Sequence, residues 1–343
     1  MHKVITFGIP SYNAAKDMDH CITSILEGSN YATDIEIIVV DDGSKDETAA
    51  KADEWEARYP GIIRAVHQEN GGHGIAVLSG LREAQGTYYK VVDSDDWLDG
   101  AALSTMLSIL RGFEERDQRV DLFISNYVYE KVYEGTHTAI GYKFALPRKK
   151  IFSWDQIGHF RPDQNLLMHS LCYRTDVLRE SNLPMPAHTF YVDNIYAYVP
   201  LPRCKTMYYA EIDLYRYFIG REGQSVNEAT MVKRLGQQFR VTRIMMESFH
   251  LYQDVESSRL RSYMMGYFTM MMAICSVLTK LSKEDCADER LKTLWKDLKE
   301  YDERMYRRAR YGVVGFFTNL RGRAGDKTTL GLYHLASKIF KFN

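Results

Sequence analysis

The sequence lacks the features that mark several classes of protein. Its five cysteines are dispersed and form no C-x-x-C pair, which argues against a disulfide framework or a zinc site and indicates a reducing compartment. Neither sign of charge is in excess, because 44 Lys and Arg stand against 45 Asp and Glu, so we expect no nucleic-acid partner. A composition of 45% hydrophobic and 26% charged residues is that of a folded globular protein.

Targeting and phosphate-binding motifs are missing as well. The first residues, "MHKVITFGIP", hold one Lys and a short β-like run, so we expect no signal peptide and a cytoplasmic protein. No P-loop occurs, and no G-x-G-x-x-G follows the first expected strand. Residues 262–279 carry no charge, but they include Ser, Thr, Gly and two Tyr. Since a membrane span usually needs about 20 mostly apolar residues, we expect a buried helix there, with a membrane-dipping helix as the alternative.

The first half of the chain alternates between strand and helix patterns. Strands are expected at 4–9, 35–40, 62–67, 88–92 and 121–127, and helices at 18–26, 48–59, 74–85 and 101–115. This rhythm predicts an α/β fold with a mostly parallel sheet and helices on both faces. In such sheets, ligands bind at the carboxyl ends of the strands.

The second half follows a different pattern. Residues 128–220 are rich in aromatic residues and prolines, which indicates loops, short strands and one or two helices, whereas the chain from about 228 onward has helical periodicity. Residues 301–343 hold nine Lys and Arg against three Asp and Glu, together with many aromatic and aliphatic residues. Such a segment fits an anionic membrane surface, for example the inner face of the cell membrane. The alternative is a helical cap with a solvated basic face.

Polar and glycine-rich segments follow four of the expected strands. They read "IPSYN" (9–13), "VDDGSKDE" (40–47), "ENGGHGIA" (69–76) and "DSDDWLD" (93–99). In a parallel sheet they meet at one edge, where carboxylates can hold a hard divalent cation that takes its other ligands from phosphate. The combination predicts a site for a metal-bridged nucleoside diphosphate. Each piece also has a structural alternative, since "DDGS" is a common turn and helix cap and His73 could be a solvated loop residue.

In this order and spacing, "PSYN", "VVDDGSKDET", "NGGHG" and "KVVDSDDWLD" resemble family 2 glycosyltransferases of the GT-A fold, of the type that builds bacterial surface polysaccharides. The resemblance covers residues 3 to about 225. It implies a GT-A domain over 1–225, with a donor half at 1–127 and an acceptor half at 128–225, followed by a helical region at 226–343. It also implies inverting transfer of a sugar from a nucleotide-sugar, expected to be a UDP-sugar, to a hydroxyl of a glycan or lipid-linked acceptor.

The resemblance also assigns roles to residues. Asp42, with Asp41 beside it, would contact the base, and Asp95 would hold Mn²⁺ or Mg²⁺ against the diphosphate. The other expected donor-binding residues are Pro10, Tyr12, Asn70, Gly71, His73, Asp93, Ser94, Arg216 and Arg221. The last two lie in "YRYFIGREGQSVN" (215–227), which corresponds to a loop that closes over the diphosphate, or alternatively to a hairpin with solvated arginines. We expect Asp96 to be a supporting or capping acid and Asp99 to be the N-cap of the following helix.

Two positions depart from the family pattern. Many members continue the glycine loop as A-R-N-x-G, whereas this chain has Val77 and Leu78 in place of the Arg and Asn. The general base of the family is an acid in an E-D-like pair about a hundred residues past the D-x-D, which maps to Asp193, while Val192 replaces the first acid. The alternative for Asp193 is a helix N-cap. "HSLCYRTDVL" (169–178) is expected to shape the acceptor side, with no role assigned to His169.

Two other functions remain open at this point, a non-catalytic GT-A scaffold subunit and a sugar nucleotidyltransferase. The second usually carries a glycine- and Arg/Lys-rich loop directly after the first strand, and "IPSYN" is not such a loop. Assembly into a homo-oligomer is also open.

Overall fold

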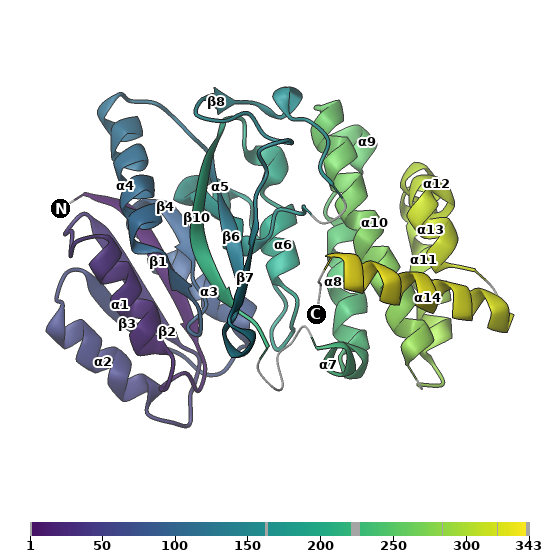
Figure 1. The fold of residues 1–343 in the computed structure, drawn as a ribbon, viewed down its shortest axis with the longest axis horizontal. Helices are drawn as coiled ribbons and strands as arrows, with labels where there is room; N and C mark the ends of the chain where they lie inside the picture. The colour runs from purple at the N-terminus through teal and green to yellow at the C-terminus, as the bar shows by residue number, and fades with distance from the viewer. Residues whose placement is uncertain (1, 162–163, 221–226, 283, 321, 341–343) are drawn as a thin grey trace. The chain divides into compact units, whose positions relative to one another are not determined.

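The structure is a computed structural model that describes residues 2–161, 164–220, 227–282, 284–320 and 322–340. The chain divides into two compact units. The first comprises Met1–Phe160 and Leu166–Ile219, and the second comprises Arg161–Asn165 and Gly220–Asn343. The first unit is α/β and the second is helical (Figure 1).

A single twisted sheet forms the centre of the first unit. Its main path has the order β3-β2-β1-β4-β9-β6-β10-β5, with β7 paired to β6 and β8 paired to β10. The strands are β1 (Lys3–Ser11), β2 (Ile35–Asp41), β3 (Ile63–His67), β4 (Gly86–Val91), β5 (Trp97–Leu98), β6 (Leu122–Lys131), β7 (Thr136–Ile140), β8 (Ile151–Phe152), β9 (Leu171–Arg174) and β10 (Met207–Phe218). Every residue of β1 and β2 is buried, as the apolar, β-branched composition of these strands predicts.

Helices cover both faces of this sheet (Figure 1). Helix α1 (Met18–Gly28) packs beside α4 (Gly100–Glu115), and α3 (His73–Glu83) packs beside α5 (Thr175–Glu180). Helix α2 (Thr48–Arg58) lies against β3, and the short α6 (Asp193–Tyr198) follows α5 along the chain. These elements confirm the predicted α/β architecture and the predicted strands and helices of the first 127 residues.

The strand register brings the ends of the parallel strands to one edge. Ser11 pairs with Asp41 and Asp41 pairs with His67, so β1, β2 and β3 end side by side. Strand β4 is parallel to β1, and its last pairing joins Gly8 and Val91. The antiparallel β9 lies between β4 and β6, so the residues that precede β9 reach the same edge.

The hairpin alternative for residues 215–227 is wrong for the described part of this segment. Residues 215–218 complete β10, which runs parallel to β6 from Met207 to Phe218 with register shifts between Tyr209 and Tyr215. Residues 221–226 lie outside the described part of the chain.

The second unit is built around α10 (Ser258–Leu281), which contains the charge-free segment. The other helices are α7 (Glu228–Lys233), α8 (Leu235–Glu247), α9 (Leu251–Asp254), α11 (Ala287–Tyr301), α12 (Glu303–Tyr311), α13 (Val313–Thr318) and α14 (Gly322–Phe340). Helix α10 has the length and composition to cross a membrane, but 61% of its apolar window is buried in the protein. That burial favours the packed helix over the membrane-dipping alternative.

Candidate active site

The acidic segment that follows β4 lies at the edge where the parallel strands end. Asp93 and Asp95 are half-buried, and Asp96 is 1% exposed. Asp99 leaves this segment as the N-cap of α4, since its Oδ1 accepts a hydrogen bond from the Ala102 amide at 3.0 Å. The structure confirms this predicted cap.

Asp96 fastens the acidic segment to β10. Its Oδ2 accepts a hydrogen bond from the Tyr215 hydroxyl at 2.6 Å, and its Oδ1 accepts one from the Phe218 amide at 2.8 Å. Burial raises the pKa of Asp96 well above the ordinary carboxyl value, and the neighbouring charges of Asp95 and Asp93 raise it further. This carboxyl is thus the supporting acid that the sequence predicted.

Asp93 lies between two histidines. Its Oδ1 is 2.8 Å from His73 Nε2, and its Oδ2 is 3.8 Å from His169 Nε2. Burial alone would raise the pKa of Asp93, but the two imidazoles outweigh burial and lower the pKa well below the ordinary value. In the reverse direction, burial opposes a charge on His73, yet the Asp93 carboxylate raises the His73 pKa. The pair therefore favours an ionised Asp93.

His169 is the site residue that sequence reasoning missed. It lies in the turn Met168–Ser170 directly before β9 and is buried. Its ring stacks on Tyr217, with ring centroids 4.4 Å apart, and tilts against Tyr215 at 4.6 Å. Its Nδ1 is buried and has no hydrogen-bond partner within the described part of the chain. The sequence signal for His169 would have been a strand antiparallel to β4. Such a strand begins at the edge where the parallel strands end, so the turn before it lies at that edge.

Asp93, Asp96 and His169 can converge on one cation. One ligand atom from each lies within 4.8 Å of the others. Two carboxylates and an imidazole, with a further half-buried carboxylate at Asp95 in the same segment, form a donor set that fits a divalent ion such as Mn²⁺. The residues present are therefore compatible with the expected metal.

Asp42 is buried (2% exposed), and both of its carboxylate oxygens are engaged by the glycine-rich loop. Oδ1 accepts hydrogen bonds from Gln68 Nε2 at 2.6 Å and the Gly71 amide at 2.8 Å, and Oδ2 accepts one from the Gly72 amide at 2.7 Å. Gly72 has φ +86°, and a Cβ there would approach the His188 amide nitrogen to 2.9 Å. Asp42 thus fixes the loop that starts α3 and carries His73.

Most of the other expected donor-binding residues lie at or just beyond the ends of β1, β2, β3 and β4. Asp41 is buried, and its Oδ1 accepts a hydrogen bond from the Ser44 amide at 3.1 Å. The exposed Asn70 donates from Nδ2 to the Asp42 carbonyl at 2.8 Å. Pro10 is buried in β1, whereas Tyr12 is 49% exposed just beyond the end of that strand. The half-buried Ser94 follows Asp93 in the acidic segment.

Arg216 is already paired with two carboxylates. Its guanidinium contacts Asp99 Oδ2 and Glu130 Oε1, each at 2.8 Å. A phosphate would have to displace one of these partners, which makes Arg216 a weaker phosphate ligand than the sequence suggested. Arg221, the second expected arginine, lies outside the described residues.

Asp193, about a hundred residues beyond the acidic segment, lies within electrostatic range of Asp93, His73 and His169. It is half-buried at the start of α6, where the Asn194 side chain approaches its Oδ1 at 3.3 Å. Burial raises its pKa, the positive charges of His169 and His73 oppose this shift, and the Asp93 charge adds to it. These four residues therefore act on one another electrostatically. The N-cap position of α6 is held by Val192 without a side-chain capping bond, which argues against the N-cap alternative for Asp193.

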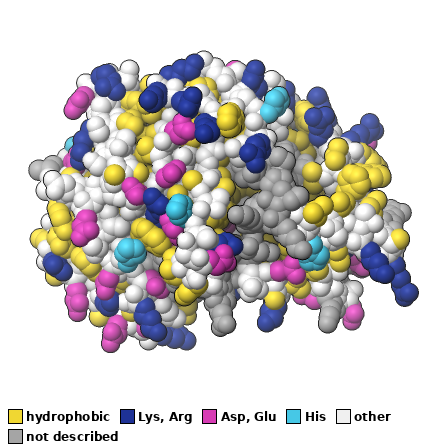
Figure 2. All heavy atoms as spheres, viewed as in Figure 1, with side chains coloured by type: hydrophobic (Ala, Val, Ile, Leu, Met, Phe, Trp, Pro, Cys, Tyr) yellow, Lys and Arg dark blue, Asp and Glu magenta, His cyan; other side chains and the backbone are white. Residues whose placement is uncertain are grey.

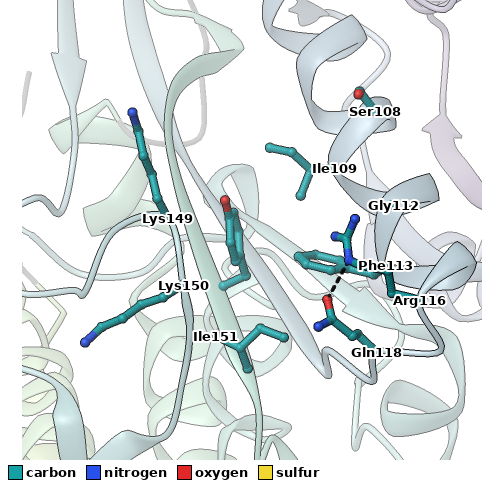
Figure 3. A pocket seen from close by; sticks show the side chains of 10 residues that line it. Ser108, Ile109, Gly112, Phe113, Arg116, Gln118, Lys149, Lys150 and Ile151 are labelled. Atoms are coloured by element: carbon teal, nitrogen blue, oxygen red, sulfur yellow. Dashed lines mark hydrogen bonds between the residues drawn. The ribbon is translucent and has the colours of Figure 1, made fainter.

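A hollow lies at the opposite edge of the sheet, away from the acidic segment. It measures about 560 Å³ and is lined by the end of α4, the start of β10 and the segment before β8, including Phe113, Arg116, Lys149, Lys150 and Tyr208. Figure 3 shows Arg116 hydrogen-bonded to Gln118 and the two lysines pointing in different directions. None of the predicted site residues lines this hollow.

Comparison with known proteins relates this chain to glycosyltransferases by sequence. Residues 6–167 match the family model "Glycosyl transferase family 2". The uncharacterized glycosyltransferase EpsJ of Bacillus subtilis is 37% identical over 101 residues, which are 29% of this chain and 28% of EpsJ. The uncharacterized glycosyltransferase YibD of Escherichia coli is 24% identical over 257 residues, which are 72% of this chain and 71% of YibD. The chain thus spans less than a third of EpsJ and about seven tenths of YibD.

Solved structures share the fold. Staphylococcus aureus TarS 1–349 in complex with UDP-GlcNAc has a TM-score of 0.66 at 14% identity, over 97% of this chain and 92% of TarS. The mannosyltransferase PcManGT from Pyrobaculum calidifontis, in complex with GDP-Man and Mn²⁺, has a TM-score of 0.52 at 14% identity, over 93% of this chain and 88% of PcManGT. The fold is therefore GT-A, and residues 6–167 form a glycosyl transferase family 2 domain.

Proposed function

We propose that this protein is an inverting, metal-dependent glycosyltransferase that moves a sugar from a nucleotide-sugar to a hydroxyl of a glycan or lipid-linked acceptor. One observation supports this most directly. Asp193 interacts electrostatically with Asp93, His73 and His169, which supports a general base near an acidic donor site at one edge of the sheet. The TarS complex with UDP-GlcNAc supports the nucleotide-sugar, with UDP as the nucleotide we propose.

The nucleoside would lie between the end of β1 and the glycine-rich loop. Tyr12 and Asn70 are both exposed there, and the fully engaged carboxylate of Asp42 holds the loop in place. Asp93 and Ser94 start the neighbouring acidic segment, which would place the ribose and diphosphate next to them. His73 follows the same loop, and its Nε2 is 2.8 Å from Asp93 Oδ1. It could therefore supply the positive charge that the missing Arg of the family pattern would provide.

A divalent cation would be held by Asp95 together with the Asp93, Asp96 and His169 cluster. When bound, such an ion supplies positive charge to the departing diphosphate. The complex of PcManGT with Mn²⁺ supports Mn²⁺ or Mg²⁺ as the metal. The protein's own contribution is the rigid placement of these ligands, through the Tyr215 and Phe218 hydrogen bonds to Asp96 and the stacking of His169 on Tyr217.

Asp193 would act as the general base. It takes the proton from the acceptor hydroxyl while that oxygen bonds to the anomeric carbon and the bond from this carbon to the diphosphate oxygen breaks. Attack on the face opposite the leaving group inverts the anomeric centre. Burial raises the pKa of Asp193, and a more basic carboxylate is a better proton acceptor, provided that it stays ionised at working pH.

The test compares Asp193→Asn with the wild type in a transfer assay over UDP- and GDP-sugars, with and without Mn²⁺. We expect transfer to fall at least about a hundredfold, the usual contribution of a general base, while the affinity for the nucleoside diphosphate stays unchanged in calorimetry. Asp176→Asn, which removes an acid paired with Arg174 and Arg119 outside the site, is the matched control. Near-normal turnover of Asp193→Asn would refute the assignment, and failure of the wild type to bind a nucleoside diphosphate would favour a scaffold.

A further inference from the structure

Helix α13 of the second unit presents large apolar side chains to solvent. Val313 is 76% exposed, Val314 49%, Phe316 54% and Phe317 43%, and the preceding Tyr311 is 68% exposed. We call these five residues the α13 patch. Figure 2 shows hydrophobic side chains gathered at the surface over α12 and α13, with Lys and Arg beside them. Contiguous apolar surface of this kind marks an interaction site on a folded protein.

The packing of α13 explains why its apolar side chains face outward. The residue on its buried side is Gly315, which lies so close to the Ala309 carbonyl of α12 that a Cβ there would collide with it. The Phe317 carbonyl accepts a hydrogen bond from Thr329 of α14 at 2.8 Å. Backbone contacts therefore hold α13 against α12 and α14, while its valine and phenylalanine side chains stay exposed and can contact another surface.

The charge around the patch is positive. Residues 302–335 contain seven Lys and Arg against three acids, Asp302, Glu303 and Asp326, and Asp326 pairs with Lys280 of α10. The Arg304 guanidinium makes a cation–π contact with the ring of Tyr252, and Arg307 forms an ion pair with Glu303. Three further cations are exposed and form no ion pair within the described part of the chain, namely Arg308, Arg323 and Lys327.

We propose that the α13 patch docks the protein on an anionic lipid bilayer, with the five apolar side chains entering the interface and the surrounding cations meeting lipid headgroups. Aromatic and aliphatic side chains flanked by basic residues are the composition that favours this interface. A second copy of the chain is disfavoured as the occupant, because a contact between two such patches would bring like charges together. The α13 patch is thus the part of the basic C-terminal segment that would contact the bilayer, and this role does not depend on the proposed chemistry.

The test is co-sedimentation of the full chain with vesicles of phosphatidylcholine alone or mixed with phosphatidylglycerol. We expect binding to the mixed vesicles, weakened when salt rises from about 0.1 M to about 1 M because the Debye length falls from about 10 Å to about 3 Å. The double variant Phe316→Ser with Phe317→Ser should lower the bound fraction about tenfold or more. Arg308→Glu with Arg323→Glu should remove the preference for phosphatidylglycerol.

Matched controls come from the first unit. Phe144→Ser removes an apolar side chain that is 78% exposed, and Lys149→Glu with Lys150→Glu makes the same charge change as the arginine variant. These controls should bind vesicles as the wild type does, and circular dichroism melting should show that every variant is folded. Absence of wild-type binding to the mixed vesicles, equal binding to neutral vesicles, or unchanged binding of the phenylalanine variant would each overturn the proposal. Self-association that only the phenylalanine variant loses, seen by light scattering without vesicle binding, would make the patch a copy interface instead.

Discussion

The buried carboxylate of Asp42 provides a sharp test of how the donor site is held together. The resemblance to family 2 glycosyltransferases assigned it to the base, but both of its oxygens accept hydrogen bonds from the glycine-rich loop. The substitution Asp42→Asn keeps the shape of the side chain and replaces one oxygen by an NH₂ group. Since all three partners are donors, whichever oxygen is replaced leaves at least one donor facing another donor.

The magnitude follows from these contacts. If the amide oxygen keeps the Oδ1 position, the bonds from Gln68 and Gly71 survive without the negative charge, and the Gly72 amide loses its acceptor. A lost charge-assisted bond with an unsatisfied amide costs about 2–4 kcal/mol. With a urea m-value of about 2 kcal/mol/M, the unfolding midpoint of the first unit should fall by about 1–2 M.

The assay is urea unfolding followed by far-UV circular dichroism, with calorimetric titration of UDP in the presence of Mn²⁺ as the second measurement. Asp41→Asn is the matched control, since this neighbouring buried acid has only a 3.1 Å bond from Ser44 and a 3.4 Å approach of His67, and it should cost clearly less. An unchanged midpoint for Asp42→Asn would refute the positioning role. A large loss of UDP affinity at unchanged stability would return Asp42 to the base contact.

Three other contacts lead to measurable effects. Gly72→Ala should lower the free energy of unfolding by about 2 kcal/mol or more and weaken UDP binding, because φ is +86° and a Cβ would press on the His188 amide; an unaffected melting temperature would contradict this. Tyr215→Phe should cost about 1–3 kcal/mol in urea unfolding, since the buried Asp96 carboxyl loses its 2.6 Å donor, and a stability equal to that of the wild type would show that Asp96 finds another partner. The Arg111 hydrogen bond lowers the pKa of Asp34, so the pair stabilises the fold above the unfolded Asp pKa of about 3.9 and this contribution is lost as pH falls through the lower folded pKa. Arg111→Met should therefore cost about 0.5–1 kcal/mol at pH 7, after allowance for its partial exposure, and almost nothing at about pH 2; a loss that does not change with pH would rule out the ion pair as its cause.

The first 127 residues were predictable because their signals are local. Apolar β-branched runs and helical spacing depend on neighbours a few positions away, and each one became the expected strand or helix. The order of the remaining strands was not predictable. Strand β10 pairs with β6 although more than 80 residues separate their partners, and β9 enters antiparallel between β4 and β6. Such pairings are decided by tertiary packing, which no window of the sequence contains.

The candidate site shows the same division between local and distant causes. The sequence shows directly that acids follow β4. The protonation state of each acid, however, depends on partners far along the chain. Asp93 is held ionised by His73 and His169, and Asp96 is pushed toward its neutral form by burial, with Tyr215 donating to it from β10. These opposite pKa shifts favour a charged Asp93 and a neutral Asp96, which reduces the repulsion within the segment. A short run of aspartates can therefore combine helix capping at Asp99 and anchoring at Asp96 with the ligand binding that we propose for this segment, but only after the fold has supplied their different surroundings.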